Sequence, residues 1–431
     1  MDKPAQAATK AFLFLQGPHG PFFHQLARSL RRAGVATWRV GFNAGDHAFW
    51  RDKTTYLPFT DCPENWPQRF RELIDQKQIT DVVLYGDTRP IHAQSVKIAT
   101  ELGLVVHVFE EGYLRPYWIS YERGGSNGHS PLIGMSLDDM RIASESNQLA
   151  KPVPPSHWGD MRQHIFYGAL YHWFVMFANR RYAHFKPHRG LPVREEFFLY
   201  FRRLLQMPLH VFQRSLATRR ILSGDFPYHI VLLQLEHDSS FQTHGDFENQ
   251  RDFLEHVIKG FADGAAQHHH LVFKAHPLEN GRAPLLADIR RFALSYGVEN
   301  RLHYVGGGKL APLLDGALSA VTVNSTSGQQ ALWCGLPLRI FGACIYDKPR
   351  LVSRQPIADF FAEPIRPDQQ SYIEFRDFLL GTSQLPGGYY SRKGRRQLLR
   401  RATEMMLQRR DPYALHTTKT EADRQQLRVV K

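Results

Sequence analysis

The sequence predicts an α/β protein with two doubly wound, Rossmann-like domains and an additional helical insertion. Three observations support this fold class. Short apolar runs alternate with helical patterns over residues 11–109, the same alternation returns over residues 228–341, and a stretch rich in aromatic residues and arginine separates the two series. Strands that alternate with helices indicate mostly parallel sheets with helices on both faces.

The first series defines a domain over residues 1–150. Apolar runs predict strands over residues 11–16, 35–40, 81–85 and 104–109, and helical patterns predict helices over residues 21–32, 67–76 and 91–102. After residues 124–128 the alternation stops, and a proline-rich break follows at residues 151–155. We place the end of the domain at this break.

The second series defines a domain over residues 225–385. Strands are expected over residues 228–235, 270–275, 302–305, 320–324 and 338–341, and helices over residues 251–262, 285–296, 309–314, 327–333 and 371–380. The two series share their architecture but no repeated residues. Two Rossmann-like domains that face a central cleft form the GT-B architecture, which is common among glycosyltransferases that use nucleotide sugars.

Two further segments have a different composition. Residues 151–224 are expected to form helical pieces in which aromatic residues such as Trp173 and Phe177 mix with arginines. Such pieces either lie on an anionic membrane surface or pack on the domains with their arginines in solvent, and the composition leaves both open. Residues 386–431 are expected to form a basic helix and a polar tail, with the basic face turned to solvent or to lipid.

Composition limits the class of protein. A chain of 431 residues with a net charge of +13 and a pI near 9.6 has room for two cores and favours an anionic partner. The basic residues are scattered and form no recognition module, so a nucleic-acid partner is not expected. The three cysteines lack zinc-like spacing, and no apolar run is long enough for a signal peptide or a spanning helix. We therefore expect a cytoplasmic protein.

The most informative stretch of the first domain is an acidic turn at the end of a predicted strand. Glu110 and Glu111 follow an apolar run and precede Gly112, which permits a sharp turn, and Arg115. In an open α/β sheet, groups at the carboxyl end of a strand face the ligand crevice. Two adjacent carboxylates there repel, which favours a raised pKa or a cationic partner. A solvated acidic turn is the alternative.

Two motifs occupy strand ends of the second domain. Lys274, His276 and Pro277 follow one strand, where an imidazole can contact a phosphate or donate a proton to a leaving group. Ser325, Thr326 and Ser327 lie between a strand and a helix, where hydroxyl groups and free N–H groups suit a phosphate; ordinary helix capping uses the same residue types. The run of histidines at residues 268–270 has no accompanying carboxylate or cysteine and predicts no metal site.

Other strand ends supply weaker candidates for substrate binding. They are Gln234, Asp238 and Ser239 in the second domain, and Gly17, His19, Gly20, Asp87 and Arg89 in the first. The glycine loop at residues 17–20 does not match the dinucleotide fingerprint and offers room for close approach of an acceptor. An internal Asp87–Arg89 pair is the alternative to a role at the rim of the site.

Six segments together resemble the capsular polysaccharide biosynthesis proteins of the KpsS/LipB type. They are FLFLQGPHGPFF at residues 12–23, LYGDTRPIH at 84–92, VFEEGYLRPYWIS at 108–120, LQLEHDSS at 233–240, KAHPLENG at 274–281 and NSTSGQQALWCGLP at 324–337. Each is weak alone, but their common order is specific. The resemblance spans roughly residues 11–410.

The resemblance implies a retaining β-Kdo transferase of Gram-negative bacteria. Such proteins use CMP-β-Kdo and start the poly-Kdo linker of a capsule on lysophosphatidylglycerol. They work at the cytoplasmic face of the inner membrane, alongside a second Kdo transferase and an ABC exporter. Related enzymes share an acidic motif, matched here by Glu110, Glu111 and Gly112, and a His–Pro motif that binds CMP, matched by His276 and Pro277. Many relatives have Asp in place of Glu111, so nucleophile and base both remain open for this residue.

The expected mechanism needs no metal or other cofactor. Glu111 is the predicted catalytic carboxylate, and Lys274, His276 and residues 325–327 are predicted to stabilise the departing CMP phosphate. The sequence has no DxD pair, and cationic and N–H donors suffice for a single phosphate. Two alternatives remain, a non-catalytic lipid-binding or scaffolding subunit of the capsule export machinery and a GT-B nucleotide-sugar epimerase.

Overall fold

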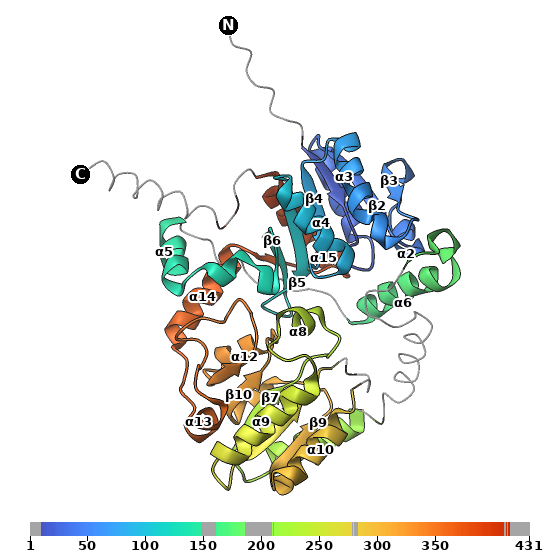
Figure 1. The fold of residues 1–431 in the computed structure, drawn as a ribbon. Coiled ribbons are helices and arrows are strands. Elements are labelled where there is room, and N and C mark those ends of the chain that lie inside the picture. The colour runs from blue at the N-terminus through green and yellow to red at the C-terminus, as the bar shows by residue number, and fades with distance from the viewer. Residues whose placement is uncertain are drawn as a thin grey trace, which may run out of the picture. The chain divides into compact units, whose positions relative to one another are not determined.

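The computed structural model describes residues 10–147, 161–185, 209, 211–277, 279, 283–408, 411 and 413. The chain forms two compact units. Unit 1 comprises residues 1–131, 142–194 and 378–431, and unit 2 comprises residues 132–141 and 195–377. Each unit contains one sheet with helices packed against it (Figure 1). The predicted α/β class with two Rossmann-like halves is confirmed.

The sheet of unit 1 has seven strands in the order β12-β6-β5-β4-β1-β2-β3. Their bounds are β1 (Ala11–Phe14), β2 (Ala36–Gly41), β3 (Tyr56–Pro58), β4 (Asp81–Tyr85), β5 (Val105–Glu111), β6 (Trp118–Arg123) and β12 (Gln384–Pro386). Strands β1 to β5 are parallel, whereas β6 runs antiparallel to β5 and β12 antiparallel to β6. The sequence patterns predicted β1, β2, β4 and β5 but missed the three others.

Helices cover both faces of this sheet. The helices of unit 1 are α1 (Phe22–Arg32), α2 (Ala44–Ala48), α3 (Trp66–Lys77), α4 (Pro90–Glu101), α6 (Met161–Phe177) and α15 (Arg392–Leu407), while α5 (Leu137–Asn147) is divided between the two units. Alternate residues of β1 point to opposite faces: Phe12 and Phe14 pack with α1 and α15, while Leu13 and Leu15 pack with α3 and α4. Helix α6 contacts α2.

The C-terminal helix α15 corrects the predicted domain organisation. Residues 386–431 were expected to form a basic helix and a polar tail apart from the two domains, but α15 packs against α1 and belongs to unit 1. Its apolar stripe, which includes Leu398, Ala402 and Met406, is buried in the hydrophobic core that the sheet forms with α1. Arg395 is also buried and donates to the backbone carbonyl oxygens of Tyr389 and Tyr390, so this arginine is part of neither a solvated nor a lipid-facing patch.

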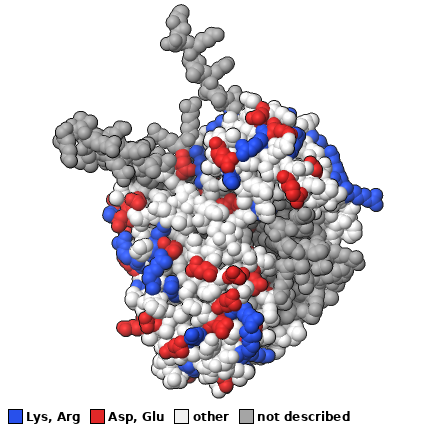
Figure 2. Space-filling model, viewed as in Figure 1, with Lys and Arg blue, Asp and Glu red and all other residues white. Residues whose placement is uncertain are grey.

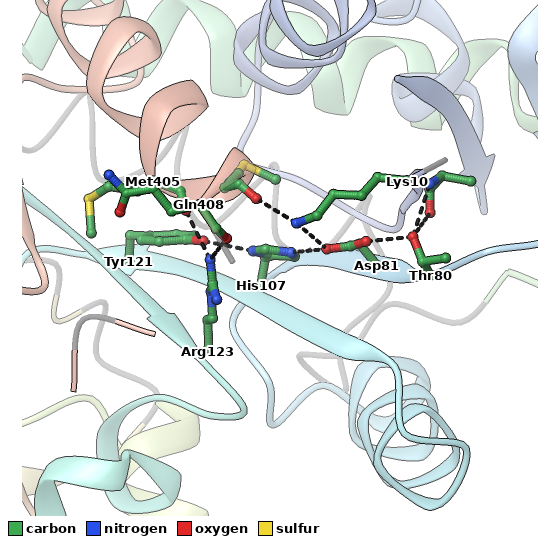
Figure 3. Close-up of polar contacts among 10 residues, drawn as sticks. Lys10, Thr80, Asp81, His107, Tyr121, Arg123, Met405 and Gln408 are labelled. Atoms are coloured by element: carbon green, nitrogen blue, oxygen red, sulfur yellow. Dashed lines mark hydrogen bonds and ion pairs between the residues drawn. The ribbon is translucent and has the colours of Figure 1, made fainter. Parts of the chain in front are cut away.

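A buried polar network ties the amino-terminal ends of the unit 1 strands to α15 (Figure 3). The Tyr121 hydroxyl lies 2.7 Å from His107 Nδ1, and His107 Nε2 lies 2.8 Å from Asp81 Oδ1. Asp81 also accepts a hydrogen bond from the Thr80 hydroxyl and lies 3.6 Å from the Lys10 ammonium group. Lys10 in turn donates to the carbonyl oxygen of Met406 in α15.

The sheet of unit 2 has five parallel strands in the order β11-β10-β7-β8-β9. The strands are β7 (Tyr228–Leu232), β8 (His270–Lys274), β9 (Leu302–Val305), β10 (Ala317–Thr322) and β11 (Leu338–Ile340). The helices are α8 (Ser239–His244), α9 (Gln250–Gly264), α10 (Leu285–Ser295), α11 (Ala311–Asp315), α12 (Gly328–Trp333), α13 (Ile357–Ala362) and α14 (Gln369–Gly381). Side chains of α9, α10 and α13 bury one face of the sheet.

Of the predicted helical insertion, residues 161–185, 209 and 211–224 are described; they include α6, a short 3-10 helix over Asn179–Tyr182 and a further helix over residues 211–222. Tyr171 and Val175 of α6 are buried, whereas Phe166 and Phe177 are exposed by 60% and 67%. Among the described helices, none is both long and apolar enough to cross a membrane. Basic and acidic side chains are interspersed on the face drawn in Figure 2.

Candidate functional site

The predicted catalytic carboxylates lie at the carboxyl end of β5, where the last strand residue is Glu111. Both side chains are half-buried. Glu110 Oε1 accepts a hydrogen bond from the Glu111 backbone N–H at 3.1 Å, so Glu110 fixes the backbone of its neighbour. Glu111 Oε1 lies 3.4 Å from the Tyr85 hydroxyl, and no ion pair to Glu111 occurs within the described ranges. The carboxylate of Glu111 therefore keeps oxygen lone pairs for a substrate.

Gly112 lets the chain turn from β5 into the antiparallel strand β6. A Cβ atom at this position would lie 2.1 Å from the Trp118 carbonyl oxygen, a distance that no side chain tolerates. Beyond the turn, the Tyr113 backbone N–H donates to Gln384 Oε1 of β12. Arg115 is exposed and donates from Nε to the Gly112 carbonyl oxygen at 3.3 Å. The turn is thus held by backbone packing on one side and by β12 on the other.

Two tyrosines that the sequence analysis did not single out surround the carboxylates. Tyr85 at the end of β4 donates to Glu111, and the Tyr389 hydroxyl donates to the Glu110 carbonyl oxygen at 2.9 Å. Burial, with the carboxylates of Glu111 and Glu110 adding to it, raises the pKa of both phenols well above the ordinary value. Both therefore stay protonated hydrogen-bond donors at neutral pH. Tyr389 is far from Glu110 in sequence. The GGYY run at residues 387–390 is the one local signal that could have drawn attention to this tyrosine.

Asp87 and Arg89 follow β4 but do not pair with each other. Asp87 Oδ2 accepts from the Ser126 backbone N–H at 2.8 Å and lies 3.2 Å from His129 Nδ1, so this carboxylate holds the loop after β6. Arg89 donates to Gln16 Oε1 at 2.9 Å, and its guanidinium carbon lies 5.4 Å from the centroid of the Tyr85 ring. Arg89 thus remains at the carboxyl edge of the sheet, as the rim interpretation requires, whereas Asp87 is buried.

The glycine loop after β1 is covered by α6. The His19 ring stacks on Tyr171 with ring centroids 4.3 Å apart, and a Cβ atom at Gly20 would lie 3.2 Å from the Tyr167 ring. Gly20 has a φ of +115°, which favours glycine, and a Cβ atom at Gly17 would meet Phe23. The close approach that the sequence predicted for an acceptor is made here by aromatic side chains of α6.

In unit 2, the strand order reverses between β7 and β10, which is the point where open α/β sheets bind ligands. Two amides join the strands there. Gln234 Nε2 donates to Asn324 Oδ1 at 2.8 Å, and the Asn324 backbone N–H donates to Gln234 Oε1 at 3.0 Å. Gln234 is buried, and its side-chain amide is used in the hydrogen bonds to Asn324, so it holds the ends of the two strands together.

Lys274, the last residue of β8, is buried and donates from Nζ to the Ala275 carbonyl oxygen at 3.1 Å. Burial, with a further contribution from the positive charge of Arg214, lowers the pKa of Lys274 to about 8. His276 is half-buried, and its carbonyl oxygen accepts from the Glu279 backbone N–H. The exposed Pro277 follows it. A cation and an imidazole thus leave the same strand end.

Residues 325–327 connect β10 to α12. The Ser325 hydroxyl accepts from the Ser327 backbone N–H at 3.2 Å, and the Ser325 carbonyl oxygen accepts from the Tyr346 hydroxyl. Ser325 is therefore used locally, but it does not cap the helix: the N-cap of α12 is Ser327, whose side chain makes no capping hydrogen bond. Within the described part of the chain, the Thr326 hydroxyl and the backbone N–H groups of Ser325 and Thr326 have no hydrogen-bond partner, so they are the donors this loop offers to an anion.

The remaining predicted residues lie near the same edge of unit 2. Asp238 is half-buried and immediately precedes α8, whose first residue is Ser239; the side chain of Ser239 lies outside the described set. Searching the described residues gives no group of three His, Cys, Asp or Glu side chains placed to hold a metal ion. The structure thus gathers the predicted residues into two strand edges, one in each unit.

The chain is similar to proteins of capsule synthesis. A family model for capsule polysaccharide biosynthesis proteins matches residues 80–390. The capsule polysaccharide modification protein LipB of Neisseria meningitidis serogroup A is 32% identical over 387 residues, which cover 88% of this chain and 91% of LipB. The capsule polysaccharide export protein KpsS of Escherichia coli is 31% identical over 387 residues, which cover 88% of this chain and 97% of KpsS.

Among solved structures, the β-Kdo 2,7 transferase of Thermosulfurimonas dismutans KpsC aligns with 86% of this chain and 89% of its own, with a TM-score of 0.41 and 13% identity.

Proposed function

Because this chain belongs to the capsule polysaccharide biosynthesis protein family, we propose that it is a glycosyltransferase that moves β-Kdo with retention from CMP-β-Kdo to lysophosphatidylglycerol. The transfer would start the poly-Kdo linker of a capsule. The observation that carries the proposal is the position of Glu111, a half-buried carboxylate without an ion-pair partner among the described residues, at the carboxyl end of a strand in an open α/β sheet.

In the proposed reaction, a Glu111 oxygen attacks the anomeric carbon of Kdo, and the bond to the CMP phosphate breaks with its electron pair leaving on CMP. The acceptor hydroxyl then displaces the carboxylate from the same carbon and gives its proton to a base or to water. Two inversions produce net retention. Glu110 supports this role because it accepts the backbone N–H of Glu111 and so positions the nucleophile.

The donor phosphate is proposed to bind at the strand edge of unit 2. The Lys274 ammonium group, the His276 imidazole and the hydrogen-bond donors of Ser325 and Thr326 lie at this edge. Together they supply a charge and several N–H or O–H donors, which stabilise a departing phosphate without a metal. Support comes from their chemistry and from their shared position at the carboxyl ends of parallel strands.

The test is mass analysis of lysophosphatidylglycerol incubated with the protein and CMP-Kdo generated in situ. A gain of the mass of one Kdo is expected. Glu111→Gln is expected to lose transfer by at least about a thousandfold while CMP affinity changes less than twofold, because the amide keeps the shape but is no nucleophile. Glu110→Gln is the matched variant and should retain measurable transfer. Near wild-type turnover by Glu111→Gln would remove the proposed role, and a protein that binds lipid but never releases CMP would be a scaffolding subunit.

We further propose that the protein works peripherally on the inner membrane, beside a second Kdo transferase and a capsule exporter. The support is α6, which buries Tyr171 but exposes Ile165, Phe166, Trp173 and Phe177. Exposed aromatic residues near Arg180 and Arg181 suit an anionic lipid interface. Flotation with anionic vesicles is expected to recover the protein, and Phe166→Ser with Phe177→Ser should reduce the recovered fraction severalfold. Equal recovery would contradict this part of the proposal.

A further inference from the structure

Unit 1 contains a cavity of about 290 Å³ at the carboxyl edge of its sheet. Part of its wall comes from the segments after four strands: Phe42 and Phe59 directly follow β2 and β3, Gln16 lies two residues after β1, and Arg89 lies four residues after β4. The strand order reverses between β1 and β4, so the cavity occupies the ligand-binding position of this half. Of the site residues predicted from the sequence, Arg89 is the one that lines this cavity.

Most of the cavity lining is apolar. Phe42, Phe59, Ile91 and Phe185 contribute rings and an aliphatic chain. Phe42 and Phe59 pack on each other with ring centroids 5.9 Å apart, which fixes this wall. The volume is at the lower end of the range for small-molecule sites, too small for a whole nucleotide sugar. An apolar group of modest size therefore fits the cavity better than a sugar, which needs many polar partners.

Two polar groups break the apolar wall on the side of β4. Arg89 uses a guanidinium N–H to bind Gln16, and it has no acidic partner among the described residues, so several of its five N–H donors remain for an anion. His92 is 1% exposed and lines the cavity. Its Nδ1 lies 2.6 Å from the Gly86 carbonyl oxygen, while its Nε2 is buried and has no hydrogen-bond partner among the residues that the structure describes.

The protonation of His92 follows from its surroundings. Burial, with the charge of Arg89 adding to it, lowers the pKa of His92 to about 3, so the ring is neutral at pH 7. With Nδ1–H donating to the Gly86 carbonyl oxygen, Nε2 carries a lone pair. The buried lone pair needs a donor such as a ligand hydroxyl group, because an unsatisfied buried acceptor costs free energy.

The charges along the cavity give its occupant a direction. Arg89 follows β4, whereas the acidic residues Asp61 and Glu64 follow β3. The sheet order places β1 and β2 between β4 and β3, so these two strands are three strand spacings, about 14 Å, apart. An anionic group is attracted to the Arg89 end and repelled from the other. Strand β4 neighbours β5, so the anionic end lies on the side of Glu111.

We propose that this cavity binds a single-chain amphiphile, with its anionic, hydroxyl-bearing end at Arg89 and His92 and its apolar chain directed toward Phe59. The inference rests on the proposed function, in which the cavity holds the lipid acceptor. Its polar end then lies beside the carboxylate that carries the sugar. Tyr85 links the two places, since its ring faces Arg89 and its hydroxyl donates to Glu111.

The test is calorimetric binding of hexyl, octyl and decyl phosphate, each below its micellar concentration, with inorganic phosphate as the head-only probe. Wild type is expected to bind roughly tenfold more tightly for each two methylene groups added, until the cavity is filled. Arg89→Gln should weaken every alkyl phosphate by about tenfold and keep the dependence on chain length. Arg71→Gln, an exposed arginine on α3, is the charge-matched control and should bind as wild type.

Phe185→Asp places a carboxylate on the apolar wall and should abolish the dependence on chain length, whereas Phe185→Leu should keep most of it. Unchanged CMP affinity and unfolding transitions check that each variant is folded. Affinity that does not depend on chain length, or an unaltered dependence in Phe185→Asp, would overturn the inference. Transfer of Kdo without alkyl phosphate binding would reject the cavity alone, and binding as expected without transfer would reject the proposed function alone.

Discussion

Asp81→Asn tests whether the buried network of unit 1 holds the sheet to its C-terminal helix. Asp81 is 1% exposed and accepts hydrogen bonds from His107 Nε2–H and the Thr80 hydroxyl. Burial alone would raise its pKa, but the hydrogen bond from His107, with Thr80 and Lys10 adding to it, outweighs burial and lowers the pKa. Burial lowers the pKa of His107 despite this partner, so the network is a carboxylate beside a neutral imidazole.

The expected cost follows from these contacts. A hydrogen bond to a charged group contributes about 1 kcal/mol more than a neutral one, so the two short bonds to Asp81 together lose about 2 kcal/mol. The ion pair to the partly exposed Lys10 adds at most about 1 kcal/mol. Asp81→Asn is therefore expected to destabilise unit 1 by about 2–3 kcal/mol, while the exposed Asp75→Asn should change stability by less than about 0.5 kcal/mol.

The assay is urea unfolding at pH 7 followed by tryptophan fluorescence, because Trp50 and Trp66 are buried in unit 1. Tyr121→Phe removes the hydroxyl that donates to His107, and its effect should be non-additive with Asp81→Asn by at least about 0.5 kcal/mol, since both act through one imidazole. Additive effects, or a loss below about 0.5 kcal/mol for Asp81→Asn, would show that the network adds nothing as a unit.

Three further predictions follow. Lys274, with its pKa near 8, should bind the CMP phosphate severalfold less tightly at pH 9 than at pH 7, and Lys274→Arg should flatten this profile in CMP titrations. Burial, with His269 adding to it, lowers the pKa of His229 to about 3, so at this residue the unfolded chain binds an extra proton between pH 6.5 and 3. His229 alone should therefore contribute about 2 kcal/mol to the stability lost from pH 7 to pH 5 in urea unfolding, and His229→Phe should show a loss smaller by that amount. Gly112→Ala should abolish transfer and cost about 1–3 kcal/mol in thermal unfolding, because its Cβ atom would meet the Trp118 carbonyl oxygen, whereas Gly134→Ala meets no atom within 4 Å and should be neutral.

The sequence allowed prediction of elements with a strong apolar period. The parallel strands β4, β5, β8 and β9 are mostly apolar runs, and their predicted positions agree with the structure to within two residues. Strand β6 escaped notice because its sequence WISYER carries Ser120 and Glu122 at buried positions. These polar groups are satisfied by partners distant in sequence, such as the amide of Gln384 for Ser120. The alternation of apolar and polar residues within a strand does not indicate partners that lie so far away in the sequence.

The candidate site shows the same division. The positions of Glu111, Lys274 and Thr326 were predictable because each lies within three residues of the end of an apolar run, and the sequence reveals where such runs end. The surroundings were not predictable. Asp87 turned inward to bind the loop at Ser126, and Tyr389 reached Glu110 from the other end of the chain. Both depend on loops and distant segments, whose course no periodicity encodes.

The return of residues 378–431 to unit 1 has a consequence for how a cell makes this protein. A ribosome releases all of unit 2 before β12 and α15 emerge, so unit 2 is able to finish folding first. Until then, β6 pairs with β5 alone and leaves its other edge without a partner strand, and the apolar face around Phe12 and Phe109 is not covered by α15. The nascent chain is thus most prone to aggregation late in synthesis. A chain that stops before Gln384 should precipitate, although it already contains the predicted site residues of unit 1 and of unit 2.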